Sequence, residues 1–252
     1  MGELEGKIAL VTGSSRGIGA SCARVMAREG ADVVVNYRQN LEAAEAVAED
    51  IRAFGRQTKI VQADVSDLEQ IQSMLHQVLE GWGRIDILVN NAGHHFTQPY
   101  TLDTLNWNQW EEALDTNLTS QLACIKAVVP SMKERRWGRI VNMSSVTSQR
   151  GSRSGDVCYV ASKSGVNGLA RGLYAQLAPF GITINTVSPG TIDTDLTRSV
   201  LSPQKIPQYV ARIPMGRMGE PDEIAEVVSF LCSDRAAYIT GQLIAVNGGE
   251  YV

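Results

Sequence analysis

Cysteine and histidine are scarce in this sequence of 252 residues, which holds four of the first and three of the second. The cysteines lie far apart without a Cys-x-x-Cys pair, so they predict reduced thiols and no disulfide framework. They are Cys22, Cys124, Cys158 and Cys232. The adjacent His94 and His95 cannot easily bind one metal ion, and no carboxylate or cysteine spacing supports them. We therefore expect no metal site.

Long apolar runs are also missing, since no segment approaches the ~20 apolar residues that span a bilayer. The formal net charge of −4 disfavours a nucleic-acid or anionic-membrane partner. The first residues lack the apolar core of a secretory signal, and Gly6 stands where a myristoylation motif needs Ser or Thr. We therefore predict a cytoplasmic protein with no membrane or nucleic-acid partner.

Hydrophobic residues make up 44% of the chain, which is enough for a sizeable core. Short apolar runs alternate with longer helical stretches, and no linker interrupts them. This predicts one α/β domain over residues 1–252, a doubly wound, mostly parallel sheet of about seven strands with helices on both faces. The expected strands are 7–11, 32–37, 59–62, 86–90, 139–143, 182–187 and 242–246. The expected helices run to about 28, over 40–54, from about 67, and over 106–135, 157–178 and 221–233.

A glycine-rich turn, Thr12–Gly19, follows the first predicted strand. Its glycines let backbone N–H groups approach a pyrophosphate, and the next helix directs its positive N-terminal dipole to the same place. The Gly-x-x-x-Gly-x-Gly spacing differs from the Gly-x-Gly-x-x-Gly of long-chain dehydrogenases. Because a strand precedes the turn and an amphipathic helix follows it, we predict that it binds a dinucleotide.

The end of the second predicted strand bears on which dinucleotide is bound. An NAD enzyme usually places an acid there to bind the adenosine ribose hydroxyls. Here that position is Tyr37, followed by Arg38, and Arg16 lies in the glycine turn. Two guanidiniums and no carboxylate favour the 2′-phosphate of NADP, with NAD as the alternative cofactor. The competing interpretation is that Arg38 is only a solvated loop charge.

The stretch Ser144–Lys163 carries the chemistry. Tyr159 and Lys163 are spaced to lie on one face of a helix, and Ser145 follows a predicted strand. A free phenol has a pKa near ~10, and a neighbouring ammonium lowers that pKa. Ser145 can hydrogen-bond the oxygen of a carbonyl or alcohol. These residues predict proton transfer in C=O/CH–OH chemistry, which needs a hydride carrier nearby.

In this order and spacing, the motifs resemble those of the short-chain dehydrogenase/reductase family. They are Thr12-Gly13-x-x-x-Gly17-x-Gly19, Asn90-Asn91-Ala92-Gly93, Ser145 and Tyr159-x-x-x-Lys163. The resemblance covers about residues 7–249 and implies the strand order 3-2-1-4-5-6-7 and a homotetramer. By motif, the chain looks most similar to 3-oxoacyl-carrier-protein reductases and to glucose-dehydrogenase-like members.

The resemblance also implies a role for each matching residue. Hydride would pass from a nicotinamide to a carbonyl carbon while Tyr159 gives a proton, Ser145 holds the oxygen and Lys163 binds the nicotinamide ribose. Asn117, the fourth implied catalytic residue, would distort its helix and free a backbone carbonyl for a water beside Lys163. The implied cofactor-binding residues are Gly13, Ser15, Arg16, Gly17, Ile18, Gly19, Tyr37, Arg38, Asp64, Val65, Asn91, Ala92, Gly93, Tyr159, Lys163, Pro189, Gly190, Ile192 and Thr194.

Some implied roles have structural alternatives. Asp64 matches a residue that contacts adenine, but an Asp here could instead cap the helix from about Asp67. Asn91 could tie neighbouring strands together as well as support the cofactor, and Asn117 could merely pack. The two adjacent histidines match the rim of the substrate pocket.

The chain departs from the family on the substrate side. Tyr159 follows Ser145 by 14 positions, where about 12 or 13 is usual, so we expect one extra residue in the loop 149–156. That insertion should change the mouth of the pocket and leave the chemistry intact. Residues 194–213 should form a mobile substrate lid.

Docking of an acyl carrier protein is an open question at this stage. Of two positions where carrier-protein reductases present basic side chains, one is filled by Arg136. The other matches Ala175, with Arg171 one turn earlier, while Arg150 and Arg153 add charge in the lengthened loop. All four arginines could equally be solvated surface charges. We expect free small ketones or 3-oxo esters to be reduced at least as well as carrier-bound ones.

Three functions are compatible with the sequence. The favoured one is an NADP(H)-dependent reductase of ketones or of 3-oxoacyl and 3-oxo ester carbonyls. The second is an NAD(P)-dependent alcohol or sugar dehydrogenase that uses the same residues for oxidation. The third, a nucleotide-binding regulator without catalysis, is disfavoured because a pure binder has no need of the serine–tyrosine pair.

Overall fold

The computed structural model describes residues 2–96, 100–152 and 155–252 of the chain. The strands are β1 (Ile8–Val11), β2 (Asp32–Tyr37), β3 (Thr58–Gln62), β4 (Ile87–Asn90), β5 (Gly138–Met143), β6 (Ile182–Pro189) and β7 (Leu243–Val246). The α-helices are α1 (Gly17–Arg28), α2 (Leu41–Ala53), α3 (Leu68–Trp82), α4 (Trp107–Leu114), α5 (Ser120–Arg135), α6 (Thr147–Arg150), α7 (Val157–Leu177), α8 (Asp195–Val200), α9 (Ile206–Val210) and α10 (Pro221–Cys232). A π-helical turn, η1 (Asp115–Thr119), and two 3-10 turns, η2 (Ala178–Phe180) and η3 (Asp234–Ala236), complete them.

The seven strands form one sheet in the order β3-β2-β1-β4-β5-β6-β7, and every ladder between neighbours is parallel. The predicted fold class and strand order are therefore confirmed. Parallel strands need crossover connections, which the intervening helices supply. Since both faces of the sheet are then covered, the strands read as continuous apolar runs such as IALV in β1.

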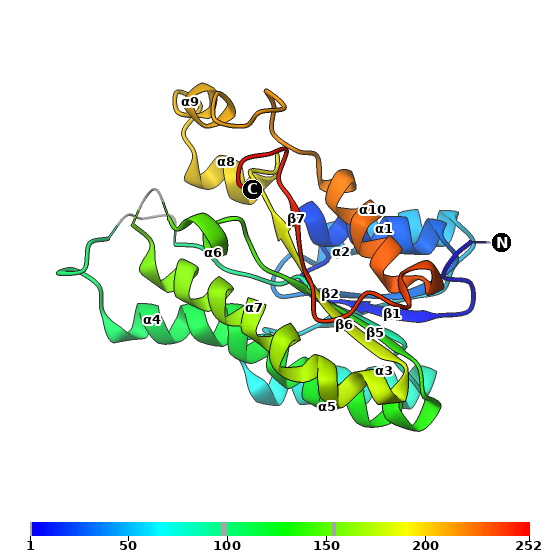
Figure 1. The fold of residues 1–252 in the computed structure, drawn as a ribbon. Coiled ribbons are helices and arrows are strands. Elements are labelled where there is room, and N and C mark those ends of the chain that lie inside the picture. Colours follow the sequence, from blue (N-terminus) through cyan, green and yellow to red (C-terminus); the bar gives the residue numbers. More distant parts are fainter. Residues whose placement is uncertain (1, 97–99, 153–154) are drawn as a thin grey trace.

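Helices cover the sheet in two layers (Figure 1). Helices α1, α2 and α10 pack on one face, where Ala9 and Val11 of β1 point. On the other face lie α3, α5 and α7, which receive Leu10. The alternation of these three residues follows from the two-residue repeat of a strand. Two separate apolar cores result, one on each side of the sheet.

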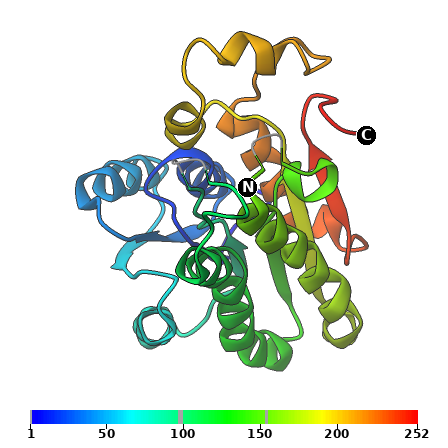
Figure 2. The ribbon, with the colours of Figure 1, turned by 90° about the vertical axis from the view of Figure 1, so that its left-hand side faces the viewer.

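The segment expected to form a substrate lid contains the short helices α8 and α9. They lie apart from the three layers, at the end of the sheet where the strands finish (Figure 1, Figure 2). Thr194 begins α8 by accepting the N–H of Thr197 at 3.2 Å. Residues of this segment therefore stand over the carboxyl edge of the sheet, where ligands of doubly wound folds bind.

The helix predicted over 106–135 is not continuous. It consists of α4 and α5 joined by the π-helical turn η1, and Asn117 lies inside that turn. The sequence-based expectation that Asn117 distorts its helix is thus met.

None of the helices in the ranges that the structure describes is long and apolar enough to cross a membrane.

Candidate active site

A cleft of about 370 Å³ opens at the carboxyl edge of the sheet, around the point where the strand order reverses between β1 and β4. Of the 19 predicted cofactor residues, all but Gly190 and Ile192 line it. Residues that were not predicted to bind the cofactor line it as well. They are Asn36, Gln39, Asn40, Ala63, His94, Thr116, Met143, Ser144, Asp195 and Leu196.

The glycine turn at one end of the cleft has no room for side chains. A Cβ on Gly19 would lie 2.4 Å from Asn91 Nδ2 and 2.5 Å from the carbonyl oxygen of Gly13. Gly17 has φ +56°, which favours glycine. Asn36 of β2 fixes the turn from behind, because its Oδ1 accepts the N–H of Gly13 at 2.9 Å. The residues present therefore fit a dinucleotide whose phosphates approach the backbone closely.

The shelf after β4 is tied to β1. Asn91 Nδ2 donates to the carbonyl oxygens of Thr12 and Gly13 at 2.9 and 3.1 Å. The hydroxyl of Thr12 accepts the backbone N–H groups of Asn91 and Ala92, each at 3.0 Å. The strand-tying role of Asn91 is confirmed by these bonds, and the same residue lines the cleft.

At the adenosine end, Tyr37 is buried and Arg38 is exposed. Arg38 Nη1 lies 3.6 Å from Asp64 Oδ2, so this guanidinium is paired within the cleft and is not a free loop charge. Asp67 caps α3 by accepting the N–H groups of Glu69 and Gln70. Asp64 instead accepts the N–H and hydroxyl of Ser66, so it is not the helix cap.

Of the residues at and after the end of β6, some line the cleft and others lie in the interior of the protein. Pro189 and Thr194 line the cleft, as predicted. Gly190 packs against the last turn of the chain, where a Cβ would lie 2.7 Å from Asn247 Cα. Ile192 is buried and bridges to Gly219 below the lid. Tight packing of the C-terminal turn thus leaves no cleft-lining position for these two residues.

The predicted catalytic residues meet at the inner wall of the cleft. Lys163 is buried, and its Nζ donates to the carbonyl oxygen of Met143 at 2.9 Å and lies 5.8 Å from the centre of the Tyr159 ring. Ser145 lies close enough to the phenol of Tyr159 to act on its pKa, which it lowers. Ser145 Oγ accepts from the N–H and the hydroxyl of Thr147 at 3.2 and 3.0 Å. The serine, tyrosine and lysine therefore form one connected group.

Burial dominates the electrostatics of this group. Burial raises the pKa of Tyr159, Ser145 opposes the rise, and the charge of Asp156 adds to it. The direction is opposite to the sequence-based expectation of a lowered tyrosine pKa, because loss of hydration on burial is the largest effect on the phenol. Burial also lowers the pKa of Lys163 to about 8. A raised phenol pKa keeps Tyr159 protonated at neutral pH, in the form that donates a proton.

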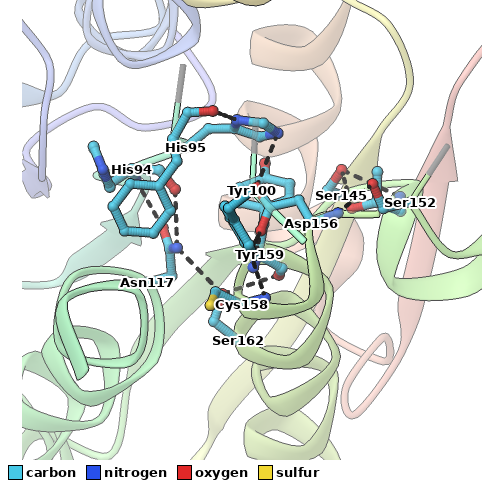
Figure 3. A network of polar contacts seen from close by, with 12 residues as sticks. His94, His95, Tyr100, Asn117, Ser145, Ser152, Asp156, Cys158, Tyr159 and Ser162 are labelled. Carbon is cyan, nitrogen blue, oxygen red and sulfur yellow. Dashed lines mark hydrogen bonds and ion pairs between the residues drawn. The ribbon is translucent and has the colours of Figure 1, made fainter. Parts of the chain in front are cut away.

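Asn117 is fully buried and connects three parts of the site (Figure 3). Its Oδ1 accepts the N–H of His94 at 2.8 Å, while Nδ2 donates to the His94 carbonyl at 3.0 Å and to Ser162 Oγ at 3.2 Å. Its backbone carbonyl accepts from Gln121 Nε2 at 3.0 Å. That carbonyl was predicted to be free for water, and the amide of Gln121 takes one of its two acceptor positions.

The two adjacent histidines have different surroundings. His94 lines the cleft, and burial lowers its pKa. The His95 ring packs against that of Tyr159, with 4.7 Å between ring centres. Both therefore stand beside the predicted reaction centre, where the substrate rim was expected.

The loop 149–156 contains the end of α6 and the residues before α7. Arg150 in it is not free to meet a ligand, because it is mostly buried and Nη2 lies 3.1 Å from Glu250 Oε1. Arg153 lies outside the described residues. Sequence reasoning missed this ion pair because its partner comes from the far end of the chain.

The chain is similar to known proteins over nearly its whole length. The family model described as "Enoyl-(Acyl carrier protein) reductase" matches residues 13–250. A 3-oxoacyl-[acyl-carrier-protein] reductase of Staphylococcus aureus strain N315 is 44% identical over 246 residues, covering 98% of each chain. The protein of that name from Pseudomonas aeruginosa is 41% identical over 249 residues, covering 99% of each chain.

A solved structure shows the same fold with bound ligands. It is a 7α-hydroxysteroid dehydrogenase complexed with NADH and 7-oxo glycochenodeoxycholic acid, with a TM-score of 0.92 and 31% identity. The match covers 98% of this chain and 94% of the dehydrogenase. Fold, glycine turn, Ser-Tyr-Lys group and whole-length relatives all agree, and the chain belongs to the short-chain dehydrogenase/reductase family.

Proposed function

We propose that the protein is an NADP(H)-dependent reductase of ketones and of 3-oxoacyl or 3-oxo ester carbonyls. One observation carries the proposal: Tyr159, Ser145 and the buried Lys163 lie together beside the cleft that the glycine turn lines. The names of the whole-length relatives, 3-oxoacyl reductases at 40–44% identity, support this substrate class.

The residues divide the work of reduction. When bound, the dinucleotide supplies the hydride. Ser145 holds the carbonyl oxygen, and Tyr159 donates its proton to that oxygen as negative charge develops. Lys163 and Asn117 lie next to Gly93 and support the tyrosine from that side. A Cβ on Gly93 would lie 3.2 Å from Lys163 Nζ and 3.1 Å from Asn117 Oδ1. Holding the carbonyl in line supplies the larger part of the rate, about 7–11 kcal/mol.

NADP is the proposed cofactor because of the charges at the adenosine end of the cleft. Arg16 and Arg38 both line it, and the position usually held by an acid in NAD enzymes is Tyr37. The Arg38–Asp64 pair holds the guanidinium beside the place where a 2′-phosphate would lie. The hydroxysteroid dehydrogenase was solved with NADH, so NAD is the alternative.

A second candidate is the reverse reaction, oxidation of an alcohol or sugar. The likeness to a dehydrogenase at a TM-score of 0.92 favours it. The same tyrosine would then act as a base, for which its raised pKa is less suited.

Self-association into a homotetramer in the cytoplasm is also part of the proposal. Large apolar side chains remain exposed on α4, α5 and α7, among them Trp107 at 77% and Tyr174 at 45%. A second copy of the chain would cover them, and light scattering on the purified protein measures the assembly.

The test is an absorbance assay with purified protein. NADPH and NADH are each mixed with small ketones, a 3-oxo ester, a 3-oxoacyl thioester and, as a control, a 2-enoyl thioester. Oxidation of NADPH by the ketones and 3-oxo compounds supports the proposal. If only the enoyl thioester, or only alcohols with the oxidised cofactor, react, the proposal fails.

A further inference from the structure

A second polar group lies beside Tyr159, formed by Asp156, Tyr100 and His95, and is here called the Asp156 cluster (Figure 3). Asp156 is buried at the start of α7, while the other two residues come from the segment after β4. No step of the reaction proposed above uses any of the three. The cluster therefore needs its own explanation.

Asp156 and Tyr100 together cap the helix that carries Tyr159. Asp156 Oδ1 accepts the backbone N–H of Tyr159 at 2.9 Å. Tyr100 donates its hydroxyl hydrogen to the same carboxylate and accepts the N–H of Cys158 at 3.1 Å. Two of the N–H groups that a helix start leaves unpaired are thus satisfied by side chains.

His95 completes the cluster. Its Nε2 lies 3.4 Å from Asp156 Oδ2, and its Nδ1 lies 2.8 Å from the carbonyl oxygen of Phe96. A carbonyl can only accept, so Nδ1 carries a hydrogen and Nε2 faces the carboxylate. The ring at the same time covers one side of the Tyr159 ring.

Tyr159 needs such support because of its place in the chain. It is the third residue of α7, in the first turn, and helix ends fray. A small displacement of the phenol would break its alignment with Ser145 and the substrate.

We infer that Asp156 is a positioning residue for Tyr159, which it holds by capping α7, with Tyr100 and His95 fixing its carboxylate. The inference deepens the proposed function and rests on the role of Tyr159 in it. Asp156 acts through the backbone and through its charge, and it does not take part in proton transfer itself.

The charge of Asp156 gives the inference a second consequence. Four groups face the phenol: Lys163 from α7, Ser145 from the end of β5, His95 from the segment after β4, and Asp156. Burial raises the pKa of Tyr159 most, and Asp156 raises it further. Removing the carboxylate charge should therefore lower the tyrosine pKa.

The first test uses kinetics to separate the effect of the helix cap formed by Asp156 from the effect of its charge. Asp156→Ala should lower kcat for ketone reduction by roughly 10- to 100-fold, as expected for a misplaced catalytic group. NADPH affinity, measured by fluorescence, should stay within about threefold, because the cofactor contacts are untouched. Asp156→Asn should restore most of kcat, because Asn caps helices about as well as Asp. The kcat of Tyr100→Phe should lie between those of Asp156→Ala and Asp156→Asn.

Asp67→Ala is the matched control, since Asp67 caps α3 in the same way and lies outside the catalytic group. It should lower the melting temperature and leave kcat at saturating NADPH unchanged. An Asp156→Ala variant that keeps more than about half of wild-type kcat overturns the inference. An Asp156→Asn variant as slow as Asp156→Ala overturns it too, because the cap is then not what matters.

The second test does not need activity. Tyrosine labelled with ¹³C at Cζ reports each phenol by NMR, and Tyr159→Phe identifies the signal of Tyr159. The titration of Tyr159 should move to lower pH in Asp156→Asn, and an unmoved titration contradicts the charge effect. If the wild-type protein reduces no carbonyl, the proposed function fails, and this titration still decides whether Asp156 acts on Tyr159.

Discussion

Burial acts on the pKa values of Tyr159 and Lys163 in opposite directions. The pKa of the phenol is raised and that of the ammonium is lowered to about 8. At neutral pH the tyrosine therefore keeps its proton, as the proposed role of proton donor requires. Ser145 opposes the rise in the pKa of the phenol.

Replacing the phenol oxygen tests its assignment. Tyr159→Phe should lower kcat by at least about 100-fold, the usual range of general acid catalysis. NADPH binding should stay within a few-fold, because the hydroxyl transfers a proton and contributes little to cofactor affinity. Steady-state kinetics and fluorescence titration measure the two quantities. A Phe variant with more than a tenth of wild-type kcat would show that another residue supplies the proton.

Lys163 should lower the free energy of unfolding of the protein at neutral pH. Its pKa is about 8 when folded and returns to an ordinary 10.5 when unfolded, so the unfolded chain binds more protons between these values. The penalty of burying the ammonium is thus complete below pH 8 and disappears as the pH rises towards 10.5. Lys163→Met should be more stable than wild type at pH 7 by about 1–3 kcal/mol.

Urea unfolding at several pH values checks this prediction. The advantage of Lys163→Met should shrink as the pH rises through the window between the two pKa values. A constant difference at all pH values would mean that the lysine enters the folded state without losing affinity for its proton.

Cofactor preference should depend on Arg38. Charge-assisted hydrogen bonds contribute about 1.5–3 kcal/mol each, so contacts from two arginines give at least about tenfold preference for NADP over NAD. Arg38→Asp places a second carboxylate beside Asp64 and should flatten or reverse the ratio. The kcat/KM values with the two cofactors decide this, and a wild-type preference for NAD would refute the assignment.

Sequence reasoning found these residues where local pattern and chemistry coincide. A glycine turn after a strand and a Tyr-x-x-x-Lys pair on a helix are visible as spacings. Asn36 and Gln121 were missed because their partners, the Gly13 N–H and the Asn117 carbonyl, become neighbours only in the folded chain. The direction of the tyrosine pKa was wrong for the same reason, since burial cannot be read from spacing.

At the scale of elements, the start of α1 is built around the contact of Gly19 with the β4 shelf. Gly19→Ala would place a methyl group 2.4 Å from Asn91 Nδ2, which ties the two loops together. The variant should lower the melting temperature and weaken NADPH binding by at least about tenfold, since the phosphate-binding turn must open.

Gly172→Ala is the control for that substitution. Gly172 lies in α7 with no heavy atom within 4 Å of the added Cβ, so alanine should stabilise the helix by about 0.5–1 kcal/mol. Calorimetry and fluorescence titration compare the two variants. Equal effects on stability would mean that the crowding at Gly19 is relieved without cost.

Most elements could be predicted because the apolar residues that each one buries recur with the period of a strand or of a helix. Strand and helix boundaries differ from the expected ones by a residue or two, which is the usual fraying of helix and strand ends. The break at η1 is different, since apolar periodicity runs through it and only the family position of Asn117 pointed to it. The short helices α8 and α9, in the segment expected to form a lid, were not predicted, because Ser, Pro and Gln favour turns.

At the scale of the whole molecule, the two apolar cores and the parallel order follow from alternation of strands and helices. The order itself came from the family resemblance, because periodicity alone does not say which strands are neighbours. Surface chemistry was harder to predict. Arg150 was expected at the pocket mouth and is instead held by Glu250, so its charge is neutralised inside the protein.

Loss of that charge bears on the docking of an acyl carrier protein, which is acidic. Of the described basic residues considered for docking, Arg136 and Arg171 remain exposed. Arg136 is itself anchored, since Nη2 donates to the Pro179 carbonyl at 2.8 Å and its guanidinium lies 5.9 Å from the Phe180 ring centre. The net charge of −4 adds a weak repulsion at long range. Against that repulsion, two surface arginines provide little electrostatic attraction of the carrier protein towards the active site.

We therefore expect free 3-oxo esters and short thioesters to be reduced at least as well as carrier-bound 3-oxoacyl groups. The kcat/KM values for a 3-oxoacyl carrier substrate and its short thioester analogue, compared at low salt, measure this directly. Arg136→Glu serves as the probe of the docking face, and its kcat/KM for the short thioester should equal that of wild type. An advantage of about a hundredfold for the carrier-bound substrate, lost in Arg136→Glu, would contradict the expectation, because steering by charge acts through such rim residues.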